Sequence, residues 1–270
     1  MNGTSGFYPG KVARSIIAVL VGAFVVLPLL ATLQYTFCGG DAGCSAAHWT
    51  GIFDGSNASA YRPLWTGLTN SLVLMVATVA ILLLLVAPTM ILINLRFPRL
   101  RRIFEFIALL PITIPAVVLV VGLRAVYQQV TGVFGTATWT LAFAYGVLIL
   151  PYSVRAIQAN IDAINLTTLA EAARSLGASW LKVVWRVLAP NLRTGLLAGS
   201  LIAVAVVLGE FTVASLLARE NLQTALVVVN QTDSYVAVIF SLLALVFCFV
   251  LLLLIGRIGR VGTGRKEPEA

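Results

Sequence analysis

The sequence predicts an all-α membrane protein with six transmembrane helices. Hydrophobic residues make up 60% of the chain and charged residues only 10%, whereas a soluble domain carries about 25% charged residues. The chain also contains six apolar runs that reach the length of about 20 residues that a helix needs to cross a bilayer. The expected spans are 15–36, 68–94, 103–127, 138–158, 192–217 and 235–256.

The first and third runs each carry an additional signal. Lys11 and Arg14 precede the first run, as basic residues precede a signal peptide. Because its apolar stretch is longer than the usual 7–15 residues and no A-x-A site follows, we interpret it as an uncleaved signal-anchor helix. The third run contains Pro111 and Pro115. Membrane helices tolerate proline where neighbours satisfy the freed backbone groups, so a kinked or interrupted span is expected.

The basic residues predict the orientation of these spans. Fifteen of the 18 Lys and Arg residues fall on one side of the six-span layout. Cytoplasmic loops carry such an excess, so both termini are expected in the cytoplasm. The predicted organisation is a cytoplasmic N-terminus 1–14, a transmembrane domain 15–256 and a cytoplasmic tail 257–270, disordered over 261–270. The net charge of +8 then reflects topology, and no nucleic-acid partner is expected.

The cysteines and the single histidine limit the chemistry. Cys38 and Cys44 lie in an extracytoplasmic loop, 37–67. An oxidising compartment would allow a disulfide between them, and two free thiols are the alternative. With one His and three Cys, neither a His-rich metal site nor a catalytic triad can be assembled.

The cytoplasmic loop 159–191 is polar but has helical patterning. Thr168 and Glu171 match a capping box at the start of a helix. Gly177 is placed to end this helix, and Ser179 can cap a second, short one. The apolar positions we assign are Leu169, Ala172, Ala173 and Leu176 in the first helix, then Trp180, Val183, Val184, Val187 and Leu188 before Pro190.

Three interpretations of this helix–turn–helix are possible. It could be an amphipathic return into the fifth span, a DNA-binding unit, or a docking element for a cytoplasmic partner. A DNA-binding role is disfavoured because the loop is tethered at both ends to membrane helices and is too short to fold alone. Docking is supported by small residues that flank charged ones, which suits insertion into a groove on a partner.

The stretch "EAARSLGASWLKVVWRVLAP" resembles the EAA motif of permease subunits in binding-protein-dependent ABC importers. The residues at matching spacing are Glu171, Ala172, Ala173, Gly177 and Pro190, and the departures are Val187 for the usual Ile and Ala189 for the usual Leu. The resemblance implies the type I importer permease fold. It also implies that this loop is a coupling helix seated in a groove of an ATP-hydrolysing subunit.

The resemblance implies several partners and a location in the bacterial plasma membrane. They are two ATPase subunits, a second permease or a second copy of this chain, an extracytoplasmic solute-binding protein and membrane lipid. ATP and Mg²⁺ would be bound by the ATPase, so this chain is expected to hold no cofactor and to be no enzyme. It has no G-x-x-x-x-G-K-[ST] loop, since "GFYPGKV" at 6–12 has one residue too few and Val12 at the Ser/Thr position.

Two ionisable residues inside predicted spans are candidates for the translocation pathway. Ionisable groups at membrane depth are costly and therefore indicate function. Glu210 and Arg124 lie about 18 and 21 residues from the cytoplasmic ends of their spans, hence at similar depth. Glu210 could contact a cationic substrate or could pair with Arg124 as a structural ion pair. Glu105, next to Arg101 and Arg102, is expected to form an interfacial ion pair.

The string "LGEFTVASLL" resembles permeases of the polyamine, ferric-iron, molybdate and sulfate importers. Among these the chain most resembles the second permease of spermidine/putrescine systems, so a polyamine is the expected solute. Ferric iron, phosphonate, thiamine, molybdate and sulfate are the alternatives. A protein of another class, a standalone ion-coupled secondary transporter, would show inverted repeats, and none is visible.

Overall fold

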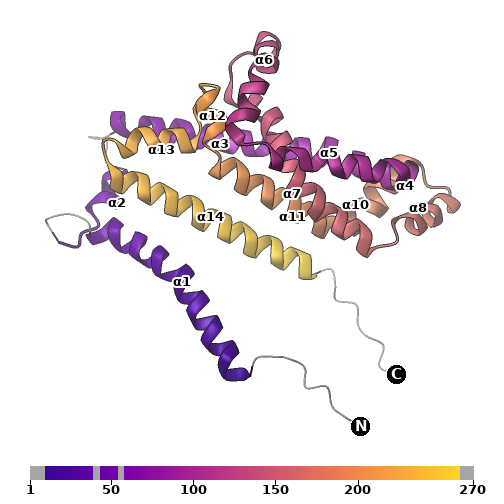
Figure 1. Cartoon of the computed structure of the whole chain (residues 1–270), viewed down its shortest axis with the longest axis horizontal. Coiled ribbons are helices and arrows are strands. Elements are labelled where there is room, and N and C mark those ends of the chain that lie inside the picture. Colours follow the sequence, from indigo (N-terminus) through magenta and orange to yellow (C-terminus); the bar gives the residue numbers. More distant parts are fainter. Residues whose placement is uncertain (1–9, 39–42, 54–57, 262–270) are drawn as a thin grey trace. The chain divides into compact units, whose positions relative to one another are not determined.

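The chain forms helices almost throughout its described residues (Figure 1). The computed structural model describes residues 10–38, 43–53 and 58–261. Within these described ranges, five helices are long and apolar enough to cross a membrane, or six if one bent pair counts as a single span. The predicted class, an all-α membrane protein, is confirmed. Most of the predicted tail 261–270 and of the N-terminal segment 1–14 lies outside the described residues.

The chain divides into two compact units, which we describe separately. The first comprises residues 1–61 and 229–243, and the second comprises residues 62–228 and 244–270. In the first unit, α1 (Lys11–Cys38) coincides with the predicted signal-anchor span. Its apolar side chains are almost all exposed, which is the surface that a helix presents to lipid rather than to water.

Aromatic and polar contacts fasten the end of α1. α2 (Ala47–Gly51) packs against it, so the predicted loop 37–67 is partly helical. The indole of Trp49 donates a hydrogen bond to Thr36 Oγ1 at 3.2 Å and stacks on Phe37. Trp side chains favour positions where one edge is apolar and the other polar. These contacts give the end of the span a defined structure.

Asp233 begins α14 (Ser234–Val261), the last predicted span. Its Oδ1 accepts hydrogen bonds from the backbone N–H groups of Tyr235 and Val236 at 3.0 and 3.2 Å. A side-chain oxygen in this position satisfies N–H groups that the first helical turn leaves free. Oδ2 accepts a further hydrogen bond from the Tyr61 hydroxyl at 2.9 Å.

In the second unit, one continuous apolar helix replaces the predicted span 68–94. α3 (Ala58–Ile81) continues through a π-helical turn, Leu82–Val86, into α4 (Ala87–Arg96). The apolar stretch covers 38 residues, so it begins about ten residues earlier than predicted. The π turn places Leu82 and Val86 in the buried core, and such turns inside helices often mark functional sites.

The predicted third span is two helices. α5 (Arg101–Thr113) ends before Ile114, which has an extended backbone (φ −101°, ψ 125°), and α6 (Ala116–Phe134) begins after Pro115. A proline disfavours helical geometry in the residue before it, which explains the break. The predicted interruption is confirmed, but a single span over 103–127 is wrong. α5 has 13 residues, about 20 Å, and is too short to cross a bilayer.

α7 (Ala142–Ala163) and α11 (Arg193–Gly209) lie side by side and form the centre of the second unit (Figure 1). Three small buried residues, Gly195, Gly199 and Ala203, recur every fourth position along α11. A Cβ on Gly195 would lie 2.7 Å from Asn160 Cβ, so only glycine fits there. Small residues at this spacing let membrane helices approach closely.

α11 ends earlier than the predicted fifth span. It stops at Gly209, and Glu210 adopts an extended backbone (φ −89°, ψ 118°). The short helices α12 (Thr212–Leu216) and α13 (Leu222–Asn230) follow. The prediction of a span over 192–217 is therefore wrong beyond residue 209, and the predicted outer loop after it is largely helical.

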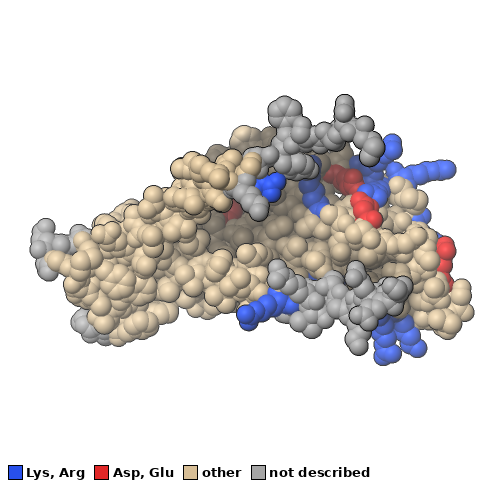
Figure 2. Space-filling view, turned by 90° about the horizontal axis from the view of Figure 1, so that it is seen from below, with Lys and Arg blue, Asp and Glu red and all other residues tan. Residues whose placement is uncertain are grey.

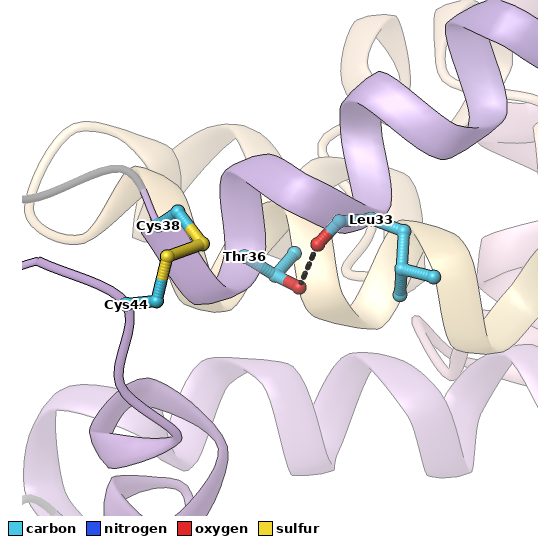
Figure 3. Close-up of a disulfide and its surroundings, with 4 residues drawn as sticks. All are labelled: Leu33, Thr36, Cys38 and Cys44. Carbon is cyan, nitrogen blue, oxygen red and sulfur yellow. Dashed lines mark hydrogen bonds between the residues drawn. A yellow bond between two sulfur atoms is a disulfide. The ribbon is translucent and has the colours of Figure 1, made fainter.

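The structure joins Cys38 and Cys44 through a disulfide at the end of α1 (Figure 3). Next to it, Thr36 Oγ1 donates a hydrogen bond to the Leu33 carbonyl at 2.7 Å. Of the two alternatives that the sequence leaves open, the structure contains the bridge.

Thiol labelling of denatured protein tests this bridge. We expect a polyethylene-glycol maleimide to add one label, at Cys248, before reduction and three labels after it, because disulfide sulfurs do not react. The number of labels is read as gel shifts. Cys38→Ser is the control and should raise the unreduced count to two by freeing Cys44. Three labels without reduction would contradict the bridge.

Candidate functional site

The first helix of the loop 159–191 begins three residues earlier than predicted. α8 spans Leu166–Ser175, and its N-cap is Asn165, whose Oδ1 accepts a hydrogen bond from the Thr168 N–H at 3.2 Å. The predicted capping box of Thr168 and Glu171 is therefore wrong. Asn is at least as good a cap as Thr, and starting here lets Leu166 be buried.

This shift rotates the buried face of α8. Leu166 and Ala170 are buried, while Leu169 and Ala173 are half-buried against the same core. The helical spacing i, i+3, i+4, i+7 was correctly predicted, but the stripe begins at Leu166. Two residues predicted to lie in it face out: Ala172 is exposed, and Leu176 is 89% exposed.

Gly177 ends α8 as predicted. Its φ of +81° lies in the left-handed region that costs other residues energy. Its N–H donates to the Arg174 carbonyl at 2.9 Å, and the Ala178 N–H donates to the Ala173 carbonyl at 3.1 Å. This pair of bonds is the Schellman motif. Arg174 reinforces the turn, because its Nη1 donates to the Ala178 carbonyl at 2.8 Å.

The second helix of the loop is longer than predicted. It consists of α9 (Trp180–Lys182), a π-helical stretch, Val183–Leu188, and α10 (Ala189–Asn191). Ser179 occupies the N-cap position, as predicted, although its side chain makes no capping hydrogen bond. This helix meets α11 at an angle of 76°. Pro190 lies in its last turn, so the chain changes direction directly after this proline.

The apolar residues of the second helix differ in burial. Val183 and Leu188 are fully buried, and Val184 and Val187 are half-buried. Trp180 is 46% exposed and its ring lies 5.4 Å from the Arg174 guanidinium carbon, an arrangement that allows a cation–π interaction. The predicted apolar face is thus correct except at its first residue.

Glu171 lies on the exposed face of α8. At 100° per residue, it projects almost opposite the buried stripe. Within the described part of the chain, its carboxylate forms no hydrogen bond or ion pair. A capping role for Glu171 is excluded by the position of Asn165. Nothing within the described fold therefore requires a carboxylate here.

Basic side chains gather around this loop. Figure 2 shows Lys and Arg clustered towards the end of the molecule where Figure 1 places α4, α8 and α10. Arg101 pairs with Glu105 at 2.7 Å, which confirms the predicted ion pair. This hydrogen bond to Glu105 is the largest cause that raises the pKa of Arg101 above its ordinary value.

The break after α11 leaves backbone carbonyl groups without hydrogen-bond partners in the helix. Side chains donate hydrogen bonds to two of these carbonyls. The Glu210 carbonyl accepts from Asn221 Nδ2 at 2.8 Å, and the Leu208 carbonyl accepts from Gln223 Nε2 at 2.6 Å. The Tyr145 hydroxyl lies 3.5 Å from the same Glu210 carbonyl. Sequence reasoning missed these residues. An Asn and a Gln two residues apart, following an apolar run, were the available signal.

Close packing holds this arrangement against α3. Asn221 is fully buried, and a Cβ on Gly67 would lie 2.6 Å from its carbonyl oxygen. Ser71 Oγ accepts a hydrogen bond from the Leu222 N–H at 2.8 Å. The break is therefore built into the fold, as irregular backbone at membrane depth must be.

The Glu210 side chain is only partly satisfied. Its Oε1 accepts a hydrogen bond from the Val213 N–H at 3.2 Å. Its Oε2 is buried, and no described residue donates to it. Buried polar atoms without partners are uncommon and often mark functional positions.

Arg124 does not pair with Glu210. Arg124 is exposed on α6, and the ion pairs among the described residues both involve Arg101. The break at Pro115 turns α6 away from the direction of α5 (Figure 1). The depth of Arg124 can therefore not be counted along one straight span, and its predicted match to the depth of Glu210 does not hold. The predicted structural ion pair is wrong, and substrate contact by Glu210 stays a prediction.

Residues 89–260 match the family described as the inner membrane component of binding-protein-dependent transport systems. The chain belongs to this family. The match covers more than half of the chain and runs from α4 through the EAA motif, which is typical of the family, into α14. The protein is thus a multi-pass inner-membrane permease with the type I importer fold. Permeases of this family transport solutes and are not catalytic subunits.

Two relatives show how far the similarity reaches. The chain is 26% identical over 224 residues to the spermidine/putrescine transport system permease protein PotB of Haemophilus influenzae, which covers 77% of each chain. It is 29% identical over 115 residues to the phosphate transport system permease protein PstA of Pasteurella multocida. That second match covers 43% of this chain and 40% of PstA.

The Gly177 turn can be tested by stability. Gly177→Ala should lower the free energy of unfolding by about 1 kcal/mol, because alanine is strained at positive φ. A Cβ there would meet no neighbour within 4 Å, so the strain is isolated from steric overlap. Thermal unfolding in detergent, followed by tryptophan fluorescence, measures the change.

Gly132→Ala is the matched control for this measurement. Gly132 lies inside α6, and a Cβ there would also meet nothing within 4 Å. Alanine is the better helix former, so this variant should be neutral or more stable by up to about 1 kcal/mol. Equal effects of the two variants would contradict the role of the turn.

Proposed function

We propose that this permease imports its solute by coupling to two cytoplasmic ATPase subunits through α8 and the Gly177 turn. The observation that supports this most directly is the exposed face of α8. This face presents a carboxylate, Glu171, and the residue directly after the helix, Leu176, adds a large apolar side chain. The described fold leaves both side chains uncovered. A helix and turn that offer small, apolar and charged residues to solvent suit a groove on a partner.

The chain's own residues would act mechanically. ATP and Mg²⁺ would be held by the ATPase subunits, and closure of these subunits would push α8. The 76° bend at Leu192 would carry this push into α11. A second permease, or another copy of this chain, would complete the pathway, and a solute-binding protein would deliver the solute from outside.

The orientation belongs to the same proposal. Docking requires α8 to face the cytoplasm, and the basic residues gathered around it agree with the positive-inside rule (Figure 2). Both termini would then be cytoplasmic, and the Cys38–Cys44 bridge would face the oxidising side.

Charge reversal at Glu171 tests docking. Glu171→Lys should reduce the amount of ATPase that co-purifies with the permease at least tenfold, because the exposed carboxylate is placed in the contact and a lysine would repel a complementary basic group. The free energy of unfolding should change by less than about 0.5 kcal/mol, as for other surface substitutions.

Glu220→Lys is the control for docking. Glu220 is also exposed, but it follows α12 in the predicted extracytoplasmic region, so ATPase binding should stay unchanged. If Glu171→Lys keeps full ATPase binding, α8 does not dock through this face.

For the solute, we propose a polyamine such as spermidine or putrescine. Three observations support this choice. The similarity to PotB extends over 77% of the chain, and the buried, partly satisfied carboxylate of Glu210 would attract a cationic group. Glu210 also lies where a membrane helix breaks, and broken helices in other transporters form binding sites at such points.

Substitution at Glu210 tests this contact. Glu210→Gln keeps the size of the side chain and removes its charge. We expect transport of putrescine into proteoliposomes to fall at least tenfold, while ATPase co-purification stays within twofold of wild type. Glu220→Gln is the matched control and should transport normally. Unchanged putrescine transport in Glu210→Gln would exclude the contact.

Phosphate is the second candidate solute, because the PstA match covers 43% of the chain at 29% identity. A binding screen of the partner solute-binding protein with putrescine, spermidine and phosphate distinguishes the two. Tight binding of phosphate alone would exclude the polyamine.

A further inference from the structure

Five polar side chains form a continuous hydrogen-bonded chain next to α8, and we call them the polar link. The Gln158 amide pairs reciprocally with the Asn94 amide, with donor–acceptor distances of 3.1 and 3.2 Å. Gln158 Nε2 also donates to Asp162 Oδ1 at 3.0 Å. Arg101 Nη2 donates to Asp162 Oδ2 at 2.8 Å, and Arg101 Nε donates to Glu105 Oε1 at 2.7 Å.

The polar link joins three helices at their ends. Asn94 lies near the end of α4, Gln158 and Asp162 lie in the last two turns of α7, and Arg101 and Glu105 begin α5. The connection from α4 to α5 is short and contains one 3₁₀ turn, Pro98–Leu100. A displacement of the end of α7 would therefore act on both neighbours through hydrogen bonds.

α8 is attached directly to this end of α7. Asp162 is followed by Ala163, the last residue of α7, and by Ile164, which has an extended backbone (φ −120°, ψ 148°). The next residue, Asn165, already caps α8. The cap of α8 lies only three residues after Asp162, so α8 cannot move far without moving Asp162.

Apolar packing reaches the same helices. Leu166 and Ala170 of α8 share a buried cluster with Met90 of α4, Ala108 of α5 and Ile161 of α7. Apolar contacts resist separation but have no directional preference. Hydrogen bonds fix which atoms stay together, and a part-buried amide pair such as Asn94–Gln158 specifies one register. Gln158 is only 7% exposed.

The exposure of the ion pair argues against a role in stability. The Arg101 and Asp162 side chains are 36% and 48% exposed, and exposed ion pairs contribute little to folding. The Arg101–Asp162 ion pair joins the ends of α5 and α7 but adds little stability. Such a pair suits the transmission of a displacement, because it can stay formed while both helices move.

From this geometry we infer that the polar link transmits the displacement of α8 to α4 and α5, and that Arg101 and Asp162 are positioning residues for transport. The inference rests on the proposed docking of the ATPase at α8. It goes further by naming the residues through which the movement leaves the coupling loop.

A spin label on α5 tests this without knowledge of the solute. Phe106, on α5 and 66% exposed, is replaced by Cys in a Cys248→Ala background, and the complex with its ATPase is studied with and without Mg-ATP. The variants are Arg101→Gln, Asp162→Asn and their combination. Arg102→Gln is the control, since Arg102 is exposed and forms no ion pair within the described chain.

We expect Mg-ATP to change the spectrum of the label in the unaltered link and in Arg102→Gln. In Arg101→Gln and in Asp162→Asn the change should fall to less than a fifth, while the amount of bound ATPase stays within twofold. The combined variant should lose no more than either single one, because both remove the same interaction.

Other results overturn the inference. A full spectral change in both single variants would show that the movement bypasses the link. Loss of ATPase binding in these variants, with binding kept in Arg102→Gln, would show that the link only supports the structure of α8. Failure of the unaltered permease to bind the ATPase would instead reject the proposed function.

Discussion

The close approach of α7 and α11 is the constraint on which the rest of the second unit depends. Glycine at position 195 lets the two helices approach closely, because a Cβ there would lie 2.7 Å from Asn160 Cβ and 3.2 Å from the Ala156 carbonyl oxygen. The loop 159–191 leaves the end of α7 and returns at the start of α11, so the separation of these two helices sets the distance that α8 and the following helix must bridge.

The second general constraint is that backbone groups inside a bilayer need partners within the protein. α11 breaks at Glu210 in spite of this constraint. The side-chain amides of Asn221 and Gln223 donate hydrogen bonds to the backbone carbonyls that the break leaves free. The break therefore depends on a loop that lies more than ten residues away in sequence. This arrangement turns an apolar helix end into a polar, structured region without adding charge.

Much of this fold could be predicted from the sequence, and the errors share a physical cause. Apolar length located the spans, and Gly177 located the turn, because both depend on local properties. The start of α8 was misplaced because Asn165 competes with Thr168 for the cap, and burial of Leu166 decides between them. The Arg124–Glu210 pair failed because depth was counted straight through the third span, although the predicted interruption at Pro115 turns α6 away from α5. The polar link and the glycine spacing on α11 were missed, since both depend on which helices are neighbours.

The exposure of Leu176 has a consequence for the free subunit. A leucine that is 89% exposed at a helix end has about 2 kcal/mol to gain from burial, a factor of about 30 in a binding constant. The same side chain is a liability while the subunit is alone, because any apolar surface could cover it. A cell that makes this protein would benefit from synthesising its partner at the same time and in matching amounts.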